Sequence, residues 1–481
     1  MEKLRVCYVS TSQLSFPGDK DAQIQRSVSE LQQLAHDLNF ALHVIQGTVI
    51  TEDDARKAVK EAEEQKTDFL LIQNTSFSAG FLIPVLARIK NANIGLWAIP
   101  EGAKDGPIPF NSFCSVSMYA SIIGHYLNQY HIPFKWYYGF SDDDLFMKRF
   151  TLTIRALSAI KNLRQSKVAL IGGIAPGFND LYFDERVLEK IYGVSINRLH
   201  EFSEIRDRAL KYKTTELQSI IAEFVKDARA VLPKAETMLE TNARVYKAYQ
   251  DFLQETGYHS LAISCWPKFQ QDFNFSVCSV VARLNDEGIV TACEGDLPSA
   301  LSMLILKYLA NDETNLMDLS GFDEADQTVL LWHCGPSSKR FAGSEGYALG
   351  VNYHALPHEK GKEPNSNGIT RDMVFGPHQI TCARVAGEGE NLFLMDGQFS
   401  ADQKKSFSGS RGWLGKLRFN REPITVRDLV NTILVQRFPH HFPLVRGEQT
   451  ELVMEFAAWL GLNLVAKVPY ENYLQAPLAW K

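Results

Sequence analysis

The first third of the chain alternates short apolar runs with stretches in which apolar residues recur at helical spacing. Residues 4–10 and 69–73 are typical of buried strands, and residues 27–38 and 55–65 are typical of helices. Residues 94–99 follow as a further strand. Strands that alternate with helices in this way predict a parallel sheet with helices on both of its faces.

A second alternating region begins with an apolar strand at residues 167–171, followed by the glycine-containing loop 172–179. A strand that runs into such a loop is similar to a nucleotide-binding turn, but the loop lacks GxGxxG and Pro176 interrupts the expected helix start. The favoured interpretation is a loop at the sheet edge that lines a pocket. Residues 300–310 form the most apolar helical stretch, and their length together with Lys307 predicts a buried helix of a soluble protein.

The last third changes character, because short strand-like runs at residues 346–353, 379–385 and 392–398 are separated by polar turns. This pattern predicts an antiparallel β module. An amphipathic helix is expected at residues 450–460, with Gly461 as its stop signal.

The predicted fold class is therefore α/β, with two Rossmann-like doubly wound domains followed by a β-rich, antiparallel barrel-like domain. The expected domains are residues 1–165, residues 166–340, which carry the acidic site residues, and residues 341–481, which include the final helix.

Composition agrees with this division, since 481 residues correspond to about three domains. A content of 45% hydrophobic and 22% charged residues is typical of a globular protein. The net charge of −6 argues against a nucleic-acid-binding protein. The chain has no apolar run of about 18 residues for a membrane span, and the first residues are too short an apolar run for a secretory leader.

The cysteines also bear on location, because their number is odd and no pair has CxxC spacing. Both observations argue against a disulfide framework or a thiolate zinc site, and they favour a reducing, cytoplasmic location. We expect Cys293 and Cys334 to be small buried neighbours of the candidate site. A nucleophilic role for Cys334 has no support from its context. The seven are Cys7, Cys114, Cys265, Cys278, Cys293, Cys334 and Cys382.

The first candidate site residue is Glu294, in the segment Ala-Cys-Glu-Gly-Asp at residues 292–296, directly ahead of the apolar helix. Gly295 permits a tight turn there, and Asp296 can cap the helix. Glu294 then lies where a strand end faces a helix start, which is where α/β sheets place ligands. It is either a helix-terminal acid that the helix dipole stabilises, or an acid/base group or metal ligand.

Two more candidates follow, Asp318 after 24 residues and His333 after a further 15. One strand–helix–strand unit spans the first interval, so the two acids could meet at adjacent strand ends. Alternatively, Asp318 is a turn or capping residue. A lone histidine that closes an apolar run, as His333 does, is more often structural than a ligand.

His440 and His441 are adjacent, lie between apolar residues and precede the final helix. Alternation along an extended chain would place their rings on opposite sides, so that one can bind a metal while the other has another role. Two carboxylates with one or two imidazoles suit Mn²⁺, Fe²⁺, Co²⁺ or Zn²⁺, and oxygen-rich sites favour Mn²⁺.

These segments resemble the L-fucose isomerase / L-arabinose isomerase superfamily. Glu294 matches the metal-binding glutamate of an AEGD-type motif, and Leu-Met-Asp at residues 316–318 matches the second acid, which is an aspartate in fucose isomerases. His333 matches a histidine of arabinose isomerases. Alignment of the downstream Gly447 makes His441 the last ligand. His440 then falls where fucose isomerases have a substrate-contacting asparagine.

The resemblance implies a metal-dependent aldose–ketose isomerase that acts on a pentose or 6-deoxyhexose, such as L-fucose, D-arabinose or L-arabinose, through an enediol. Glu294 and Asp318 would then move protons while binding Mn²⁺ or another divalent metal together with His441. His333 would be a fourth ligand or a hydrogen-bond donor to the sugar. His440 and Trp266 would contact the sugar, although Trp266 could equally be a core aromatic. The resemblance also implies a homo-oligomer, as a trimer or hexamer.

Three other functions compete with this interpretation. The first is a sugar-binding or regulatory homologue without activity, and the presence of both acids and the histidine pair argues against it. The second is a related metal-dependent sugar epimerase or lyase. The third is a nucleotide-dependent oxidoreductase, which we set aside because no acidic ribose-binding residue can be placed.

Overall fold

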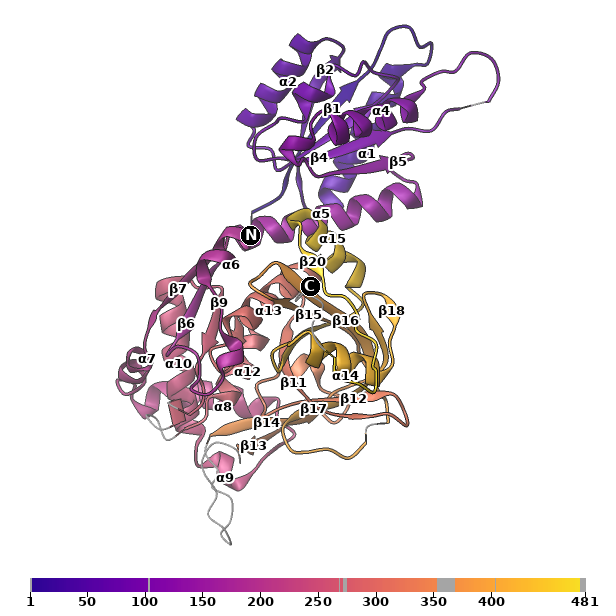
Figure 1. Ribbon diagram of the computed structural model, residues 1–481. Helices are drawn as coiled ribbons and strands as arrows, with labels where there is room; N and C mark the ends of the chain where they lie inside the picture. The colour runs from indigo at the N-terminus through magenta and orange to yellow at the C-terminus, as the bar shows by residue number, and fades with distance from the viewer. Residues whose placement is uncertain are drawn as a thin grey trace. The chain divides into compact units, whose positions relative to one another are not determined.

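The computed structural model describes residues 2–102, 104–267, 269–270, 275–352, 368–402 and 404–475. The chain forms two compact units, Met1–Lys161 and Asn162–Lys481. Each unit has a hydrophobic core of its own, and Figure 1 shows the path of the chain through both.

The first unit is built on a five-stranded sheet with strand order β2-β1-β3-β4-β5, in which every neighbouring pair is parallel. The central strands are buried along nearly their whole length, which explains their continuous apolar runs. The strands are β1 (Arg5–Thr11), β2 (Ala41–Val49), β3 (Phe69–Asn74), β4 (Asn93–Ala98) and β5 (Phe134–Tyr138).

Helices alternate with these strands, as the sequence predicts. In the second of them, Ala55, Ala58 and Ala62 are buried on one face, and Thr51 caps the start in a reciprocal pair with Asp54. The helices are α1 (Lys20–Asp37), α2 (Glu52–Glu64), α3 (Ile83–Leu86), α4 (Ser112–His125), η1 (Asn128–Tyr130) and α5 (Asp144–Arg164).

The second unit opens with a four-stranded parallel sheet of order β10-β9-β6-β7. Its strands are β6 (Lys167–Ile171), β7 (Ser195–His200), β9 (Ser260–Ile263) and β10 (Val290–Ala292). Its helical segments are η2 (Asn179–Leu181), α6 (Glu185–Tyr192), α7 (Phe202–Ala209), α8 (Thr214–Lys226), α9 (Pro233–Glu236), α10 (Leu239–Thr256), α12 (Cys278–Asp286) and α13 (Leu297–Ala310).

A closed antiparallel barrel of six strands completes this unit and confirms the predicted β-rich region. Its order is β16-β15-β19-β11-β12-β17, and β16 pairs with β17 to close it. The barrel strands are β11 (Thr314–Asp323), β12 (Thr328–His333), β15 (Gln379–Ala386), β16 (Asn391–Phe399), β17 (Ser410–Phe419) and β19 (His441–Arg446). β11 and β12 precede residue 340, and the division into three domains remains a prediction.

Further strands and helices surround the barrel. They are β8 (Ala230–Val231), β13 (Ala348–Val351), β14 (Ile369–Val374), β18 (Glu422–Pro423), β20 (Asn463–Leu464), η3 (Lys339–Phe341), α14 (Val426–Val435) and α15 (Thr450–Leu460). The strand expected at residues 346–353 is thus β13, and Tyr353 lies outside the described residues. α15 has the predicted bounds and ends at Gly461 with φ +68°.

The apolar helix α13 connects the parallel sheet to the barrel. It packs against β9 and β10 of the sheet and against β15 and β19 of the barrel, so nearly all of its residues are buried (Figure 1). This confirms the predicted buried helix. Within the described ranges, none of the helices has the length and apolar composition of a membrane span.

Candidate functional site

Glu294 lies in a tight turn that joins β10 to α13. Its φ of +62° is uncommon for a residue other than glycine, and such backbone strain concentrates at functional sites. The neighbouring backbone fixes the turn. The Gly295 N–H donates to the Ile263 carbonyl at 3.0 Å, and the Ala175 N–H donates to the Glu294 carbonyl at 2.9 Å. A Cβ on Gly295 would overlap the Gly173 carbonyl oxygen, so only glycine fits there.

Asp318 and His441 are brought together by the barrel register. They lie directly opposite each other on the antiparallel strands β11 and β19, so their side chains share one face. The His441 Nε2 lies 3.5 Å from the Asp318 Oδ1 and 3.5 Å from the Glu294 Oε2. We call Glu294, Asp318 and His441 the carboxylate–imidazole cluster.

The two acids therefore face the same imidazole nitrogen, but they do not lie at adjacent strand ends of one sheet, and that expectation is wrong. Glu294 follows the parallel sheet, whereas Asp318 lies in the barrel. The reason is that the chain changes sheets across α13, which packs between the two.

The other ring nitrogen of His441, Nδ1, faces a buried carboxylate. His441 Nδ1 lies 2.9 Å from the Asp296 Oδ2, and Asp296 also accepts from Arg384 at 2.8 Å. All three side chains are buried. Burial opposes the ionisation of Asp296, but Arg384 and His441 hold its pKa well below the usual range. Asp296 is thus an acceptor and His441 Nδ1–H is the donor, and the Nε2 atom faces the two acids.

Two groups of side chains here could hold a metal ion, Glu294 with His440 and His441, and Asp318 with His333 and His441, so that His441 belongs to both. Among the described residues, His441 Nε2 is buried and has no hydrogen-bond partner, which is the state that a metal-ligating imidazole requires. The side chains of Glu294 and Asp318 are 17% and 28% exposed, so neither acid is fully buried. Two carboxylates and one imidazole are a donor set for Mn²⁺ and related ions.

His440 has a different state from His441. Its Nδ1 lies 2.8 Å from the Asp180 Oδ2, and its Nε2 lies 3.1 Å from the Glu294 Oε2. Although burial opposes the charged form, these two carboxylates raise the pKa of His440 to about 9. A protonated ring that donates from both nitrogens has no lone pair for a metal.

The expectation that the two rings point to opposite sides is wrong. Their centroids are 4.2 Å apart, and both rings reach Glu294. Alternation does not apply because β19 begins at His441, so that His440 lies in the preceding loop.

His333, the last residue of β12, stacks on His441 with ring centroids 5.6 Å apart. The backbone N–H of Cys334 donates to the His333 Nδ1 at 2.8 Å, and burial lowers the pKa of the ring. A neutral ring that accepts at Nδ1 carries its proton on Nε2. The His333 Nε2 has no hydrogen-bond partner among the described residues, so His333 offers a donor N–H rather than a lone pair.

Trp266 lies at the rim of this region and is 38% exposed, which is inconsistent with a core aromatic. The rings of Trp266 and Phe178 meet edge to face with their centroids 5.7 Å apart. The Phe178 ring in turn packs on the His440 ring, with a centroid distance of 5.3 Å. The loop that begins at Gly172 thus places Phe178 beside His440, and the short helix η2 that follows supplies Asp180. Sequence patterns assigned no role to Asp180 or Arg384, which lie far along the chain from their partners.

No protein-family model matches the chain. The chain is similar to proteins named sulfoquinovose isomerase. It is 26% identical over 405 residues to the one from Priestia megaterium, covering 83% of this chain and 85% of the relative. It is 22% identical over 468 residues to the one from Alkalicoccus urumqiensis, covering 96% and 99%. The protein from Clostridium sp. (strain MSTE9) is 28% identical over 358 residues, covering 71% and 74%.

The chain is an isomerase. The relatives and the residues of the site support the same class, a sugar aldose–ketose isomerase.

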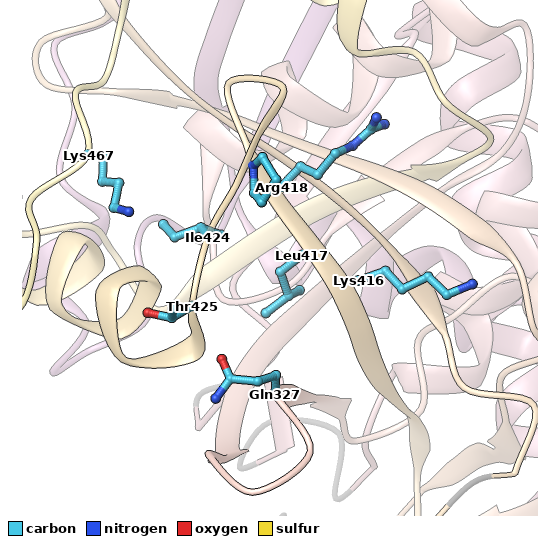
Figure 2. Close-up of a pocket in the computed structure, with 8 residues that line it drawn as sticks. Gln327, Lys416, Leu417, Arg418, Ile424, Thr425 and Lys467 are labelled. Atoms are coloured by element: carbon cyan, nitrogen blue, oxygen red, sulfur yellow. The ribbon is translucent and has the colours of Figure 1, made fainter.

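The isomerase also has a cavity of about 480 Å³, and no residue of the carboxylate–imidazole cluster is among those that line it. Its basic side chains are paired, Lys416 with Gln398, Arg418 with Asp396, and Lys467 with Asp428. Figure 2 shows that Lys416 and Arg418 extend away from the part lined by Gln327 and Thr425. The lining residues are Gln327, Lys416, Leu417, Arg418, Pro423, Ile424, Thr425 and Lys467.

Proposed function

We propose that this isomerase catalyses a metal-dependent aldose–ketose interconversion and that sulfoquinovose is its substrate. The relatives' names motivate the substrate. Sulfoquinovose is a 6-deoxyhexose that carries a sulfonate, so it falls within the sugar class expected from the sequence. L-Fucose, D-arabinose and L-arabinose are the competing substrates.

The observation that carries the proposal is the position of the His441 Nε2, 3.5 Å from both the Glu294 and the Asp318 carboxylates. Glu294, Asp318 and His441 are the residues proposed to hold the metal, with Mn²⁺ favoured by the oxygen donors. A bound divalent ion supplies a Lewis acid for two neighbouring sugar oxygens.

The protein's own groups then move the protons. One of the two carboxylates removes the proton from the carbon next to the carbonyl and returns it to the neighbouring carbon, and the other exchanges the hydroxyl proton. Negative charge develops on the sugar oxygens of the enediolate, and the His333 Nε2–H is placed to donate to one of them. We therefore propose His333 as a donor to substrate and not as the fourth ligand.

His440 and Trp266 complete the proposed substrate site. The charged His440 ring orients Glu294 through their 3.1 Å hydrogen bond and adds positive charge beside the reacting carbons. Trp266 offers an exposed apolar surface for the sugar chain.

Three broader assignments rest on the sequence. We propose that the chain is a divergent member of the L-fucose / L-arabinose isomerase superfamily, because its acid and histidine motifs match. A trimeric or hexameric assembly follows from the same resemblance. A cytoplasmic location is proposed from the odd number of cysteines and the absence of CxxC spacing.

A substrate panel tests the proposed function. The metal-free protein is given Mn²⁺ and then sulfoquinovose, L-fucose, D-arabinose or L-arabinose, and ketose formation is measured. We expect ketose from sulfoquinovose at the highest kcat/KM, and loss of turnover when a chelator is added. Turnover that survives complete removal of metal would refute the metal assignment.

The same panel separates the alternatives. Binding of sugar without any product would indicate a sugar-binding homologue. An aldose with one inverted centre would indicate an epimerase. Highest activity on a pentose would refute sulfoquinovose as substrate and leave the isomerase class intact.

A further inference from the structure

Two cysteines outside the proposed catalytic residues lie in direct contact. The Sγ atoms of Cys278 and Cys334 are 3.3 Å apart, although the residues are 56 positions apart in the sequence. Cys278 is the first residue of α12, and Cys334 directly follows β12. All seven cysteines are free, so this contact is between two thiols.

The surroundings of Cys278 favour its thiolate. The Asn352 Nδ2 donates to the Cys278 Sγ at 3.3 Å, and the Cys334 thiol lies on another side of the same sulfur. The first turn of a helix further stabilises negative charge. The contact with Cys334 lowers the pKa of Cys278. Cys278 is buried, whereas Cys334 is partly exposed.

The pair also touches the proposed catalytic site. The Cys334 Sγ lies 3.2 Å from the His333 Nδ1, and the Cys334 backbone N–H is the donor that fixes the tautomer of His333. Because the backbone of Cys334 orients His333, a covalent change at the Cys334 sulfur should also affect the position of the His333 ring.

We propose that Cys278 and Cys334 form a redox modification site at which a peroxide produces a reversible disulfide. One sulfur attacks the peroxide and becomes a sulfenic acid, and the O–O bond breaks with release of water. The second sulfur then attacks the sulfenic sulfur and expels another water. The two thiols lose two protons and two electrons in total, and hydrogen peroxide is reduced to two waters.

The required movement is small. A disulfide has an S–S bond of about 2.05 Å, so the two sulfurs must approach by roughly 1.2 Å. We expect this approach to move Cys334 and to displace its backbone N–H, which donates to His333. The loss of activity that we expect from this step rests on the proposed function, whereas formation of the bond does not.

The experiment detects the disulfide between Cys278 and Cys334 directly. The full-length protein is reduced, treated with one to a few equivalents of hydrogen peroxide, blocked with a thiol reagent and digested, and cross-linked peptides are identified by mass spectrometry. We expect a Cys278–Cys334 peptide with a mass 2 Da below the sum of the thiol forms, which a dithiol reductant removes. Sulfoquinovose turnover, measured in parallel, should fall by roughly tenfold or more and recover on reduction.

Three variants complete the test. Cys278→Ser and Cys278→Ala should abolish the cross-link. Cys114→Ser should leave it unchanged, because Cys114 is exposed and remote in sequence from the pair. Oxidation that stops at a sulfenic or sulfinic acid on Cys278 or Cys334, or a cross-link between Cys265 and Cys293 instead, would overturn the proposal. Cross-linking without any change in turnover would contradict the coupling to His333, and absence of turnover in the reduced protein would concern the proposed function alone.

Discussion

The protonation of His441 is set by its neighbours before any ligand arrives. The Asp296 carboxylate, held by Arg384, accepts a hydrogen bond from the Nδ1–H, and this orients the Nε2 toward Glu294 and Asp318. His333 has the opposite arrangement, because its Nδ1 accepts from the backbone of Cys334. The two stacked imidazoles thus have different hydrogen-bond partners, which agrees with the proposed roles of His441 as a ligand and His333 as a donor.

This difference predicts distinct effects of two matched substitutions on metal affinity. His441→Gln should weaken Mn²⁺ binding by at least the roughly 10–100-fold that loss of an outer-sphere partner costs. His333→Gln should change the affinity by less than about threefold and reduce kcat by roughly 10²-fold, because it removes a donor to the reacting oxygen. Isothermal titration with Mn²⁺ measures the first quantity. An equal loss of affinity in both variants would show that His333 is a ligand.

His440 predicts a pH dependence of stability in the metal-free protein. Its pKa is raised to about 9 in the folded state, against about 6.5 for an unperturbed histidine. The stabilisation is therefore complete below about pH 6.5 and is lost as the pH rises through 9. Solvent screening reduces its size, because the side chain is 36% exposed.

Urea unfolding of the chelated protein at pH 6, 7.5 and 9.5 measures this effect. The free energy of unfolding should fall with pH more steeply in the wild type than in His440→Asn. Parallel pH profiles of the two proteins would contradict the assignment of a charged His440.

Only some residues of the candidate site could be predicted from the sequence. Glu294, Asp318, His333 and His441 could be found because each belongs to a local motif. Asp180 could not be placed, since its partner His440 is 260 residues away. Arg384 gave no signal either, because an arginine within a strand pattern is ordinarily assigned to the surface, whereas this one is buried against Asp296.

Among the elements, the turn between β10 and α13 is restricted both by its backbone conformation and by the backbone packed against it. Gly295 combines φ of +71° with backbone contact, whereas Gly461 at the end of α15 has φ of +68° and open space within 4 Å of the position that a Cβ would take. The two glycines therefore separate the cost of a left-handed backbone from the cost of crowding.

Gly461→Ala should lower the free energy of unfolding by about 1–2 kcal/mol, the cost of a left-handed alanine. Gly295→Ala should cost roughly 1–3 kcal/mol more, because its Cβ must displace the Gly173 carbonyl. It should also lower kcat, since the turn positions Glu294. Denaturant titration of both variants provides the comparison, and equal losses of stability would show that the turn can relax.

Element positions followed well from periodicity where one face is buried, as in α15, and in the strand β6, which is buried beyond its first residue. Strand partners did not follow. β10 and β11 flank the same helix, yet they belong to different sheets. Hydrophobic spacing identifies a strand and its buried face, but it does not specify the neighbour with which that strand pairs.

For the whole second unit, the pairing of β11 with β19 in the barrel brings candidate site residues together from distant parts of the chain. β19 places His441 opposite Asp318 of β11, although Asp318 lies more than 120 residues earlier in the chain. The helix α13, which follows the Glu294 turn, packs against both sheets. The predicted β-rich fold is confirmed, but the β16–β17 pairing that closes the barrel depends on contacts that no local pattern encodes.

A metal bound by this assembled cluster should stabilise the folded state. At a free Mn²⁺ concentration 100 times its Kd, the expected gain is about 2.7 kcal/mol. The melting temperature should therefore rise when Mn²⁺ is added to chelated protein, and it should return to its starting value with excess chelator. The double variant Glu294→Gln/His441→Gln should show no rise. A rise of equal size in that variant would place the metal elsewhere.

The most direct test of the carboxylate–imidazole cluster is isomerisation in D₂O, followed by NMR, for the wild type and Glu294→Gln with Mn²⁺ and sulfoquinovose. We expect the wild type to form a ketose with deuterium at the carbon that receives the proton. Glu294→Gln, folded as judged by circular dichroism, should lose roughly 10²–10⁴-fold of this rate. Turnover by Glu294→Gln at the wild-type rate would contradict a catalytic role for the cluster.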